Sequence, residues 1–356
     1  MDVARGASRS SRTATLAVRV AATPDRLRLP MSSFDLRRLR YFVAVAKLGS
    51  VTSAARELYV AQPALSNHIK KLEEELGGEL FTRSPSGVQL TTLGDKLHGH
   101  ARKILDEIET LRDDLRGVPS EPEGTVVIGM APTIGTILAA AVLEAVTKRL
   151  PRVRVQIRET MSRDLPDLIR GGALDYALSY DIVTQRGVRS TPVFLEDSYL
   201  VGLWSKAKAY RHLERKRDVP FDALQGIPLF LSGPANAFRE KLEQTALRRR
   251  VELHIVAEVD SLAVRRELAL RGVGFTILSG TAIHVSPEEK GHLFAARIVR
   301  PRILRQICFV RAPAAPTSRA AIEVAQIIDQ TLRALLDQAA WTGASPPRKS
   351  SLVSFA

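Results

Sequence analysis

The stretch "AARELYVAQPALSNHIKKLEEELG", residues 54–77, contains two helical patterns separated by a very short link. The first pattern, over residues 52–58, is rich in alanine, so its backbone can approach a neighbouring helix closely. Residues 59–61 leave room only for a sharp bend. The second pattern begins at Gln62, and Pro63 suits the first turn of a helix because no amide hydrogen bond is needed there. The stretch therefore predicts two helices joined by a tight turn.

The second of these helices has one apolar face and one polar face. The apolar residues, at helical spacing, are Leu65, Ile69, Leu72 and Leu76. The polar residues are Gln62, Ser66, Asn67 and Lys70. Gln and Asn amides can bond adenine bidentately, Ser can bond either strand, and Lys can neutralise phosphates. Because a helix-turn-helix places such a helix in the major groove, the pattern predicts binding to double-stranded DNA. The alternative is the solvated face of an ordinary helical hairpin.

The flanking segments fit the same unit. Residues 35–47 place apolar side chains on one face at helical spacing, and Gly49 with Ser50 ends that helix. Residues 79–91, ELFTRSPSGVQLT, contain two short strand-like runs around a turn, which is typical of a β-hairpin wing. Arg83 lies next to the wing tip, where a cation can enter the minor groove, although an arginine in a turn is more often only solvated.

Residues 35–94 resemble, without a gap, the winged helix-turn-helix of the LysR-type transcriptional regulators. The family's Ala-Ala pair, Gln-Pro-Ala-Leu-Ser start of the recognition helix, Leu-Glu-x-x-Leu-Gly end and Leu-Phe-x-Arg wing occur at residues 54–55, 62–66, 72–77 and 80–83. The resemblance implies base or phosphate contacts by Thr52, Gln62, Pro63, Ser66 and Arg83. Where the family often has Arg after Ser66, this chain has Asn67, so operator preference does not transfer at that position.

A long helix is predicted over residues 92–116. Its apolar residues alternate at spacings of four and three, as in a coiled-coil seam: Leu97, Ala101, Ile104, Ile108, Leu111 and Leu115. A single amphipathic helix packed on its own domain is the alternative, and the resemblance favours a dimerising linker helix. The expected partner is therefore a second copy of the chain, in a dimer or tetramer. Residues 117–124, with two prolines, indicate a hinge.

Residues 125–335 alternate between short apolar strands and helices, which indicates an α/β module. The expected strands cover residues 125–130, 153–159, 176–180, 227–231, 254–259 and 274–278. This part resembles the LysR-type effector domain, which implies two periplasmic-binding-protein-like lobes, with the chain crossing near Thr191 and returning near Arg300. Within the family, the sequence is similar to the nitrogen assimilation control-like branch. The predicted fold class is thus α/β after a winged helix-turn-helix at 31–91.

Ligands in such sheets settle outside the carboxyl ends of strands, where helix N-termini favour anions. Thr133, Ser232 and Ser261 each follow an expected strand, so a small anionic effector is predicted to bind there. Each could instead cap a helix, which is the commoner role of Ser and Thr at such positions. Phe275 is expected either to line the effector cleft or to fill the core.

Composition limits the remaining classes. A chain of 356 residues with 45% hydrophobic and 25% charged residues is long enough for two or three domains, and a net charge of +14 favours nucleic acid or an anionic membrane surface. No apolar run is long enough to span a membrane. Cys308 is the single cysteine, so no internal disulfide forms and a reducing cytoplasm fits. Common hydrolase, phosphate-loop and zinc-helix motifs are absent, and no enzyme activity, cofactor or metal is expected.

The chain ends carry weaker signals. Residues 1–30 are expected to be a disordered extension or a start assigned too early, with Met31 as the first residue, and residues 336–356 a flexible tail. The sequence thus predicts a cytoplasmic, homo-oligomeric LysR-type regulator that binds DNA and is controlled by a small effector or by its own abundance, with RNA polymerase as a further partner implied by the resemblance. The alternative is a two-lobed solute-binding receptor or enzyme with a basic helical head, although no secretion signal is visible.

Overall fold

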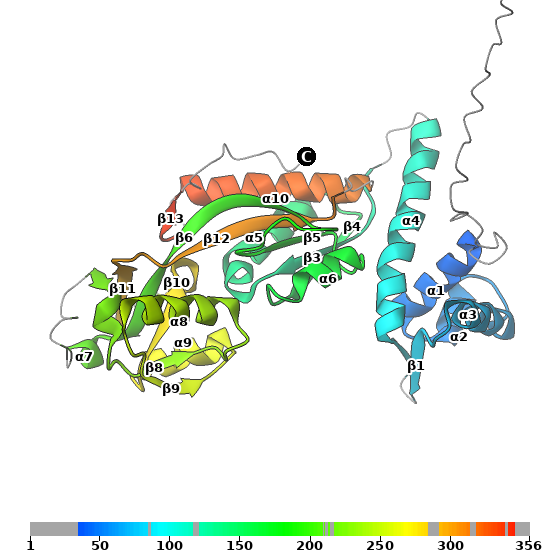
Figure 1. The fold of residues 1–356 in the computed structure, drawn as a ribbon. Coiled ribbons are helices and arrows are strands. Elements are labelled where there is room, and N and C mark those ends of the chain that lie inside the picture. The colour runs from blue at the N-terminus through cyan, green and yellow to red at the C-terminus, as the bar shows by residue number, and fades with distance from the viewer. Residues whose placement is uncertain are drawn as a thin grey trace, which may run out of the picture.

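The computed structural model describes residues 35–84, 87–116, 121–208, 210, 213, 217–283, 292–313, 318–338 and 341–345. These residues form a helical N-terminal domain, the long helix α4 (Thr92–Arg116) and a two-lobed α/β domain, so the predicted fold class is confirmed (Figure 1). The predicted extension at 1–30, the first part of the predicted hinge at 117–120 and residues 346–356 lie outside the described residues. Within the described part of the chain, no helix has the length and apolar character needed to cross a membrane.

The N-terminal domain has the predicted order of elements. It contains α1 (Leu36–Leu48), α2 (Val51–Glu57), α3 (Gln62–Leu76), β1 (Phe81–Ser84) and β2 (Gly87–Leu90), the last two paired antiparallel. Ser50 Oγ accepts a hydrogen bond from the Ser53 amide at the start of α2, and Gly49 ends α1 with φ of 61°. Ala54 is fully buried, which lets α2 lie close to its neighbours.

The predicted coiled-coil seam of helix α4 consists of a buried part and an exposed part. Leu97 and Ala101 pack into the core of the N-terminal domain together with residues of α1 and α3. Ile104, Leu111 and Leu115 are instead exposed, at 43%, 55% and 79% of their surface. The first part of the helix therefore packs on its own domain, as in the alternative interpretation, and only the second part leaves apolar side chains for another surface.

A buried ion pair joins α4 to the α/β domain. The Arg102 Nη2 atom lies 2.7 and 2.6 Å from the two carboxylate oxygens of Asp175, and Nη1 donates to the Thr125 carbonyl at 3.1 Å. Asp175 Oδ2 also accepts from the Val127 amide at 2.8 Å. Nearby, a side chain at Gly99 would collide with the backbone of residue 172, so the two segments touch. Only a satisfied pair is tolerated at this burial, because an unpaired charge there would be costly.

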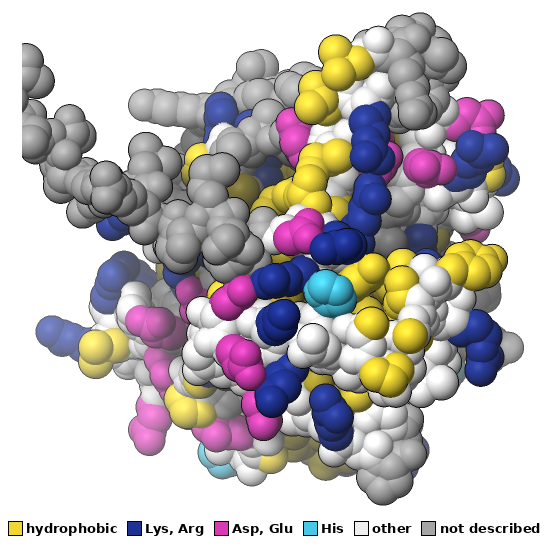
Figure 2. All heavy atoms as spheres, turned by 90° about the vertical axis from the view of Figure 1, so that its right-hand side faces the viewer, with side chains coloured by type: hydrophobic (Ala, Val, Ile, Leu, Met, Phe, Trp, Pro, Cys, Tyr) yellow, Lys and Arg dark blue, Asp and Glu magenta, His cyan; other side chains and the backbone are white. Residues whose placement is uncertain are grey.

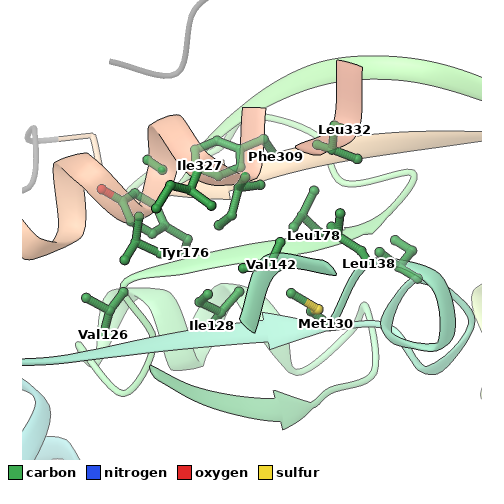
Figure 3. Packing of buried hydrophobic residues seen from close by; sticks show 14 of the residues in the cluster. Val126, Ile128, Met130, Leu138, Val142, Tyr176, Leu178, Phe309, Ile327 and Leu332 are labelled. Carbon is green, nitrogen blue, oxygen red and sulfur yellow. The ribbon is translucent and has the colours of Figure 1, made fainter. Parts of the chain in front are cut away.

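Lobe I consists of the described residues of 121–197 and 304–345. Its strands are β3 (Gly124–Met130), β4 (Val153–Glu159), β5 (Tyr176–Tyr180), β12 (Leu304–Arg311) and the first part of β6 (Arg189–Leu203), in the order β4-β3-β5-β12-β6. Helices α5 (Pro132–Arg149) and α10 (Arg319–Asp337) pack on one face of this sheet, and α6 (Leu165–Arg170) contributes to a smaller cluster. Figure 3 shows side chains of β3, β5 and β12 meeting those of α5 and α10 in the main core.

Lobe II consists of the described residues of 198–303. Its sheet contains the second part of β6, β7 (Asp218–Pro220), β8 (Leu229–Leu231), β9 (Ile255–Glu258), β10 (Phe275–Ser279) and β11 (Leu293–Val299). Its helical elements are α7 (Trp204–Ala207), η1 (Phe221–Leu224), α8 (Ala237–Arg249), α9 (Leu262–Leu270) and η2 (Gly280–Ile283). Strand β10 lies parallel to β8 and antiparallel to β6.

The two lobes share the continuous strand β6. It pairs with β12 of lobe I up to Asp197 and with β10 of lobe II from Ser198. The first crossing therefore lies after Asp197, later than the predicted position near Thr191, because one 15-residue strand runs through both sheets without a break. The chain returns between the end of β11 and Leu304, the first residue of β12.

The expectation of a flexible tail over residues 336–356 is wrong for its first part. Trp341 is only 3% exposed and packs edge-on against Phe194, with ring centroids 4.6 Å apart. Its Nε1 atom donates to Glu196 Oε1 at 3.2 Å. Residues Ala344–Ser345 form β13, which pairs antiparallel with β6. A large aromatic side chain with a hydrogen-bond partner is enough to fix this segment, which the end-of-chain position alone does not suggest.

Replacing Trp341 with alanine should lower the free energy of unfolding by about 3–5 kcal/mol, because it empties a large buried site and removes a donor to the buried Glu196 carboxylate. Urea denaturation followed by circular dichroism measures this change. Leu247→Ala is the matched control, because Leu247 is 81% exposed on α8 and its truncation should stay within about 0.5 kcal/mol. Equal effects of the two substitutions would contradict a structural role for the segment.

Candidate DNA-binding surface and inter-lobe cavity

The start of α3 presents polar side chains to solvent. Gln62, Pro63 and Asn67 are exposed, Ser66 is half-buried, and Gln62 Nε2 donates to Ser66 Oγ at 3.0 Å. No side chain caps this helix, since Ala61 precedes it, and its first turn contains no acidic residue. The positive end of the α3 dipole is therefore not neutralised by its own first turn, which favours an approaching phosphate.

The other predicted DNA contacts lie on neighbouring elements. Thr52 is exposed on α2 and Arg83 is exposed on β1, next to the tip of the wing. Lys70 is exposed on α3 but lies 3.7 Å from Glu74, so its charge is partly shared. Figure 2 shows Lys and Arg side chains, with acidic side chains beside them, on the side of the molecule that carries the N-terminal domain and α4. The polar start of α3 is flanked by Thr52 on α2 and Arg83 on the wing.

One residue of this surface was not singled out from the sequence. Tyr59, in the turn between α2 and α3, is 96% exposed and has φ of 54°. A bulky residue with a positive φ is uncommon, and here it reflects the sharp reversal that the short link requires. The sequence signal that could have identified Tyr59 is the presence of an aromatic residue in so short a link.

A cavity of about 350 Å³ lies between the two lobes. Lobe I contributes Thr133 from the first turn of α5, and lobe II contributes Ser232 just after β8. Thr133 Oγ1 lies 2.8 Å from Tyr180 Oη, and the Tyr180 hydroxyl donates to Glu196 Oε2 at 3.0 Å. Both predicted residues are thus brought to one cavity, at the carboxyl ends of parallel strands.

Ser261 and Phe275 do not line this cavity, and each has instead the alternative role that the sequence left open. Ser261 Oγ accepts from the Val264 amide at 3.4 Å and caps α9, which is the ordinary role of a serine at that position. Phe275 is 1% exposed and packs in the lobe II core near Phe294, with ring centroids 6.2 Å apart. Phe275 begins β10, whereas the cavity lies at the other end of that strand.

Two arginines that the sequence analysis did not identify also line the cavity. Arg305, on β12, places its guanidinium carbon 3.4 Å from the centroid of the Tyr180 ring and 4.7 Å from that of Phe238. Arg265, on α9, is 9% exposed, and burial together with the charge of Arg305 lowers its pKa to about 10. The Nε atoms of both side chains are buried without a hydrogen-bond partner among the described residues. No local motif marks these residues, because they are brought together only by the fold.

The described residues offer no cluster of three or more His, Cys, Asp or Glu side chains that could hold a metal ion. Cys308 is fully buried, and burial raises the pKa of its thiol. Such a thiol is a poor nucleophile because its thiolate is disfavoured. His98 is also buried in part, which lowers its pKa, and its ring lies 6.3 Å from that of Phe42.

Comparison with known proteins identifies both parts of the chain. The family model "Bacterial regulatory helix-turn-helix protein, lysR family" matches residues 36–95, and "LysR substrate binding domain" matches residues 119–333. The nitrogen assimilation regulatory protein nac of Klebsiella aerogenes is 34% identical over 254 residues, which cover 70% of this chain and 79% of that protein. The nac protein of Escherichia coli K12 is 31% identical over 249 residues, with the same coverage.

Solved structures share the fold. A full-length OxyR variant from Pseudomonas aeruginosa superposes with a TM-score of 0.66 at 24% identity, covering 89% of this chain and 99% of that chain. CbnR in complex with its target DNA gives a TM-score of 0.55 at 21% identity, covering 85% and 99%. The helix-turn-helix match accounts for the basic head that a solute-binding receptor or an enzyme leaves unexplained. The chain belongs to the LysR family of helix-turn-helix transcriptional regulators.

Proposed function

We propose that this regulator acts in the cytoplasm as a homo-oligomer, reads operator DNA with the start of α3, and responds to a small anionic effector held between its lobes without catalysing a reaction. The observation that carries the proposal is the exposed, uncapped start of α3 with its amide and hydroxyl side chains. A helix-turn-helix presents the start of its second helix to base edges in the major groove, which supports this role for those groups.

The Gln62–Ser66 pair supports a reading role. Their hydrogen bond holds the Gln62 amide close to the helix surface and orders it before DNA arrives. An ordered side chain loses less rotamer freedom when it binds a base edge, so more of the contact energy appears as affinity. Thr52 and Arg83, on the elements beside α3, can add phosphate or minor-groove contacts.

The exposed apolar residues of α4 support self-association. Ile104, Leu111 and Leu115 are exposed on α4, and the N-terminal core cluster does not include them. Apolar side chains at alternating spacings of three and four are what a second identical helix would cover in a coiled coil. Two DNA-binding domains joined in this way gain affinity because the second binding event becomes intramolecular.

The polar lining of the inter-lobe cavity supports effector binding. Thr133 and Ser232 come from different lobes, and their burial keeps competing water away from a bound ligand. A ligand that contacts both lobes can favour one arrangement of them over another. A coupling of about 1–3 kcal/mol between the cavity and the DNA-binding domains is enough to change operator affinity.

Gln62→Ala and Ser66→Ala should abolish preference for the operator, since the loss of a good base contact costs about 1–3 kcal/mol of discrimination. Lys70→Ala should weaken binding to all DNA slightly and reduce the salt slope by about 1, because a phosphate contact is sequence-blind. Fluorescence anisotropy with operator and random duplexes at several salt concentrations measures both. Equal weakening of operator and random DNA by Gln62→Ala would rule out a reading role for this residue.

Ile104→Asp should convert the oligomer to monomers that bind single half-sites weakly, because a carboxylate cannot be buried in an apolar seam without a partner. Sedimentation velocity measures the change in mass. Leu247→Asp provides the control, since it places the same charge on an exposed position of α8. An oligomer that persists in the Ile104 variant would place the interface elsewhere.

A further inference from the structure

We propose that Arg265 and Arg305 together bind the carboxylate of a small organic acid in the inter-lobe cavity. This inference rests on the proposed effector role of the cavity and specifies the chemical class of the ligand. Both arginines line the cavity, so two cationic side chains border one space between the lobes. The Nε–H of each is buried without a hydrogen-bond partner among the described residues, so neither side chain is fully satisfied within the protein.

Arg305 is held in a fixed orientation by aromatic rings. Its guanidinium carbon lies 3.4 Å from the centroid of the Tyr180 ring and 4.7 Å from that of Phe238. Stacking on ring faces occupies the faces of the planar guanidinium and leaves its N–H groups, which lie in the plane, to donate at the edge. The planar fork of an arginine matches the two oxygens of a carboxylate.

Arg265 supplies the second charge. It is 9% exposed, and the lowered pKa of its side chain reflects burial and repulsion from Arg305. Two cations that repel each other in a partly dry cavity gain most when one anion lies between them. The gain comes from relieving this repulsion in addition to forming new hydrogen bonds.

The carboxylates of the cavity are already engaged. Asp260 Oδ1 accepts from the Gly233 amide at 3.0 Å. Asp181 accepts from the Gln306 amide at 3.0 Å and forms an ion pair with Lys241 at 3.4 Å. Arg163, the remaining cation of the lining, lies 3.4 Å from Asp164 and has an exposed side chain. The two arginines therefore border a lining whose two carboxylates, Asp181 and Asp260, already accept other hydrogen bonds, which favours an anionic ligand.

The other residues of the lining indicate which chemical groups the acid carries besides its carboxylate. Phe238, Leu262 and Ile277 give the cavity apolar walls, and its volume of about 350 Å³ suits a single small molecule. The expected ligand is a small organic acid with its carboxylate toward Arg265 and Arg305 and its apolar part against these walls.

The test uses the full-length protein and four defined probes: benzoate, succinate and their neutral amides, benzamide and succinamide. Isothermal titration calorimetry should detect at least one of the acids and show it binding more tightly than its amide. Arg265→Gln and Arg305→Gln should each weaken that acid roughly 30-fold or more, because each leaves a buried charge pair incomplete. Arg305→Lys should not restore binding, since an ammonium lacks the planar fork. Arg163→Gln, at an exposed position of the same lining, should change affinity only slightly.

A second measurement separates ligand binding from structural support. Without ligand, Arg265→Gln should keep or raise the melting temperature, because it removes a buried and poorly compensated charge. An arginine that serves only structure would instead lower it when replaced. Failure of both acids to bind the unaltered protein, equal binding of acid and amide, or unchanged acid affinity in both arginine variants would each overturn the proposal.

Operator binding distinguishes this inference from the proposed function. In each arginine variant, added acid should no longer change operator affinity from that variant's own ligand-free value. If an acid binds through the two arginines but leaves operator binding and transcription unchanged, effector control fails and the carboxylate site stands. If an amide changes operator binding as strongly as its acid, the cavity is a control site and the carboxylate assignment fails.

Discussion

Strand β6 is the constraint on which the two-lobed domain depends, because one backbone belongs to two sheets. Its residues pair with β12 in lobe I and with β10 and β11 in lobe II. At the crossing, Glu196, Asp197 and Ser198 are almost fully buried, a position where acidic side chains survive only with partners. Arg302 provides two bonds of 2.9 Å to the carboxylate of Asp197. Tyr180 and Trp341 both donate to Glu196.

These partners come from parts of the chain that are far apart in sequence. Tyr180 ends a strand of lobe I and lines the cavity, Arg302 lies in the returning connection, and Trp341 belongs to the C-terminal segment. The hydrogen bonds from Thr133 through Tyr180 and Glu196 to Trp341 therefore connect the cavity wall with the last described segment. A network of this kind is favourable only when all members are satisfied, so loss of one member affects the others.

Local patterns predicted local structure well. The helix-turn-helix, the long helix and the strands β3, β4, β5, β8, β9 and β10 follow from hydrophobic spacing, turn residues and the family resemblance, whereas β6, β7 and β11 were not among the expected strands. Thr133 and Ser232 both line the cavity because each follows a strand whose end is visible in the sequence. Contacts between distant segments were not predictable in this way. Arg265 and Arg305 do not belong to a local motif. Trp341 lies in the C-terminal segment that was expected to be a flexible tail. Phe275 lies at the start of β10, away from the carboxyl end that borders the cavity, and fills the core, the second of the two roles expected for it.

Strand β5 gives the cavity a short physical route to the DNA-binding domain. Asp175, immediately before this strand, bonds Arg102 of α4, and Tyr180, its last residue, lines the cavity beneath Arg305. Because the strand is paired on both sides, with β3 and β12, it cannot bend easily between these two residues. A ligand that changes the position of Tyr180 therefore acts on the same rigid element that anchors the linker helix. The buried Arg102–Asp175 pair is thus the contact through which β5 and α4 meet, at the opposite end of the strand from the cavity.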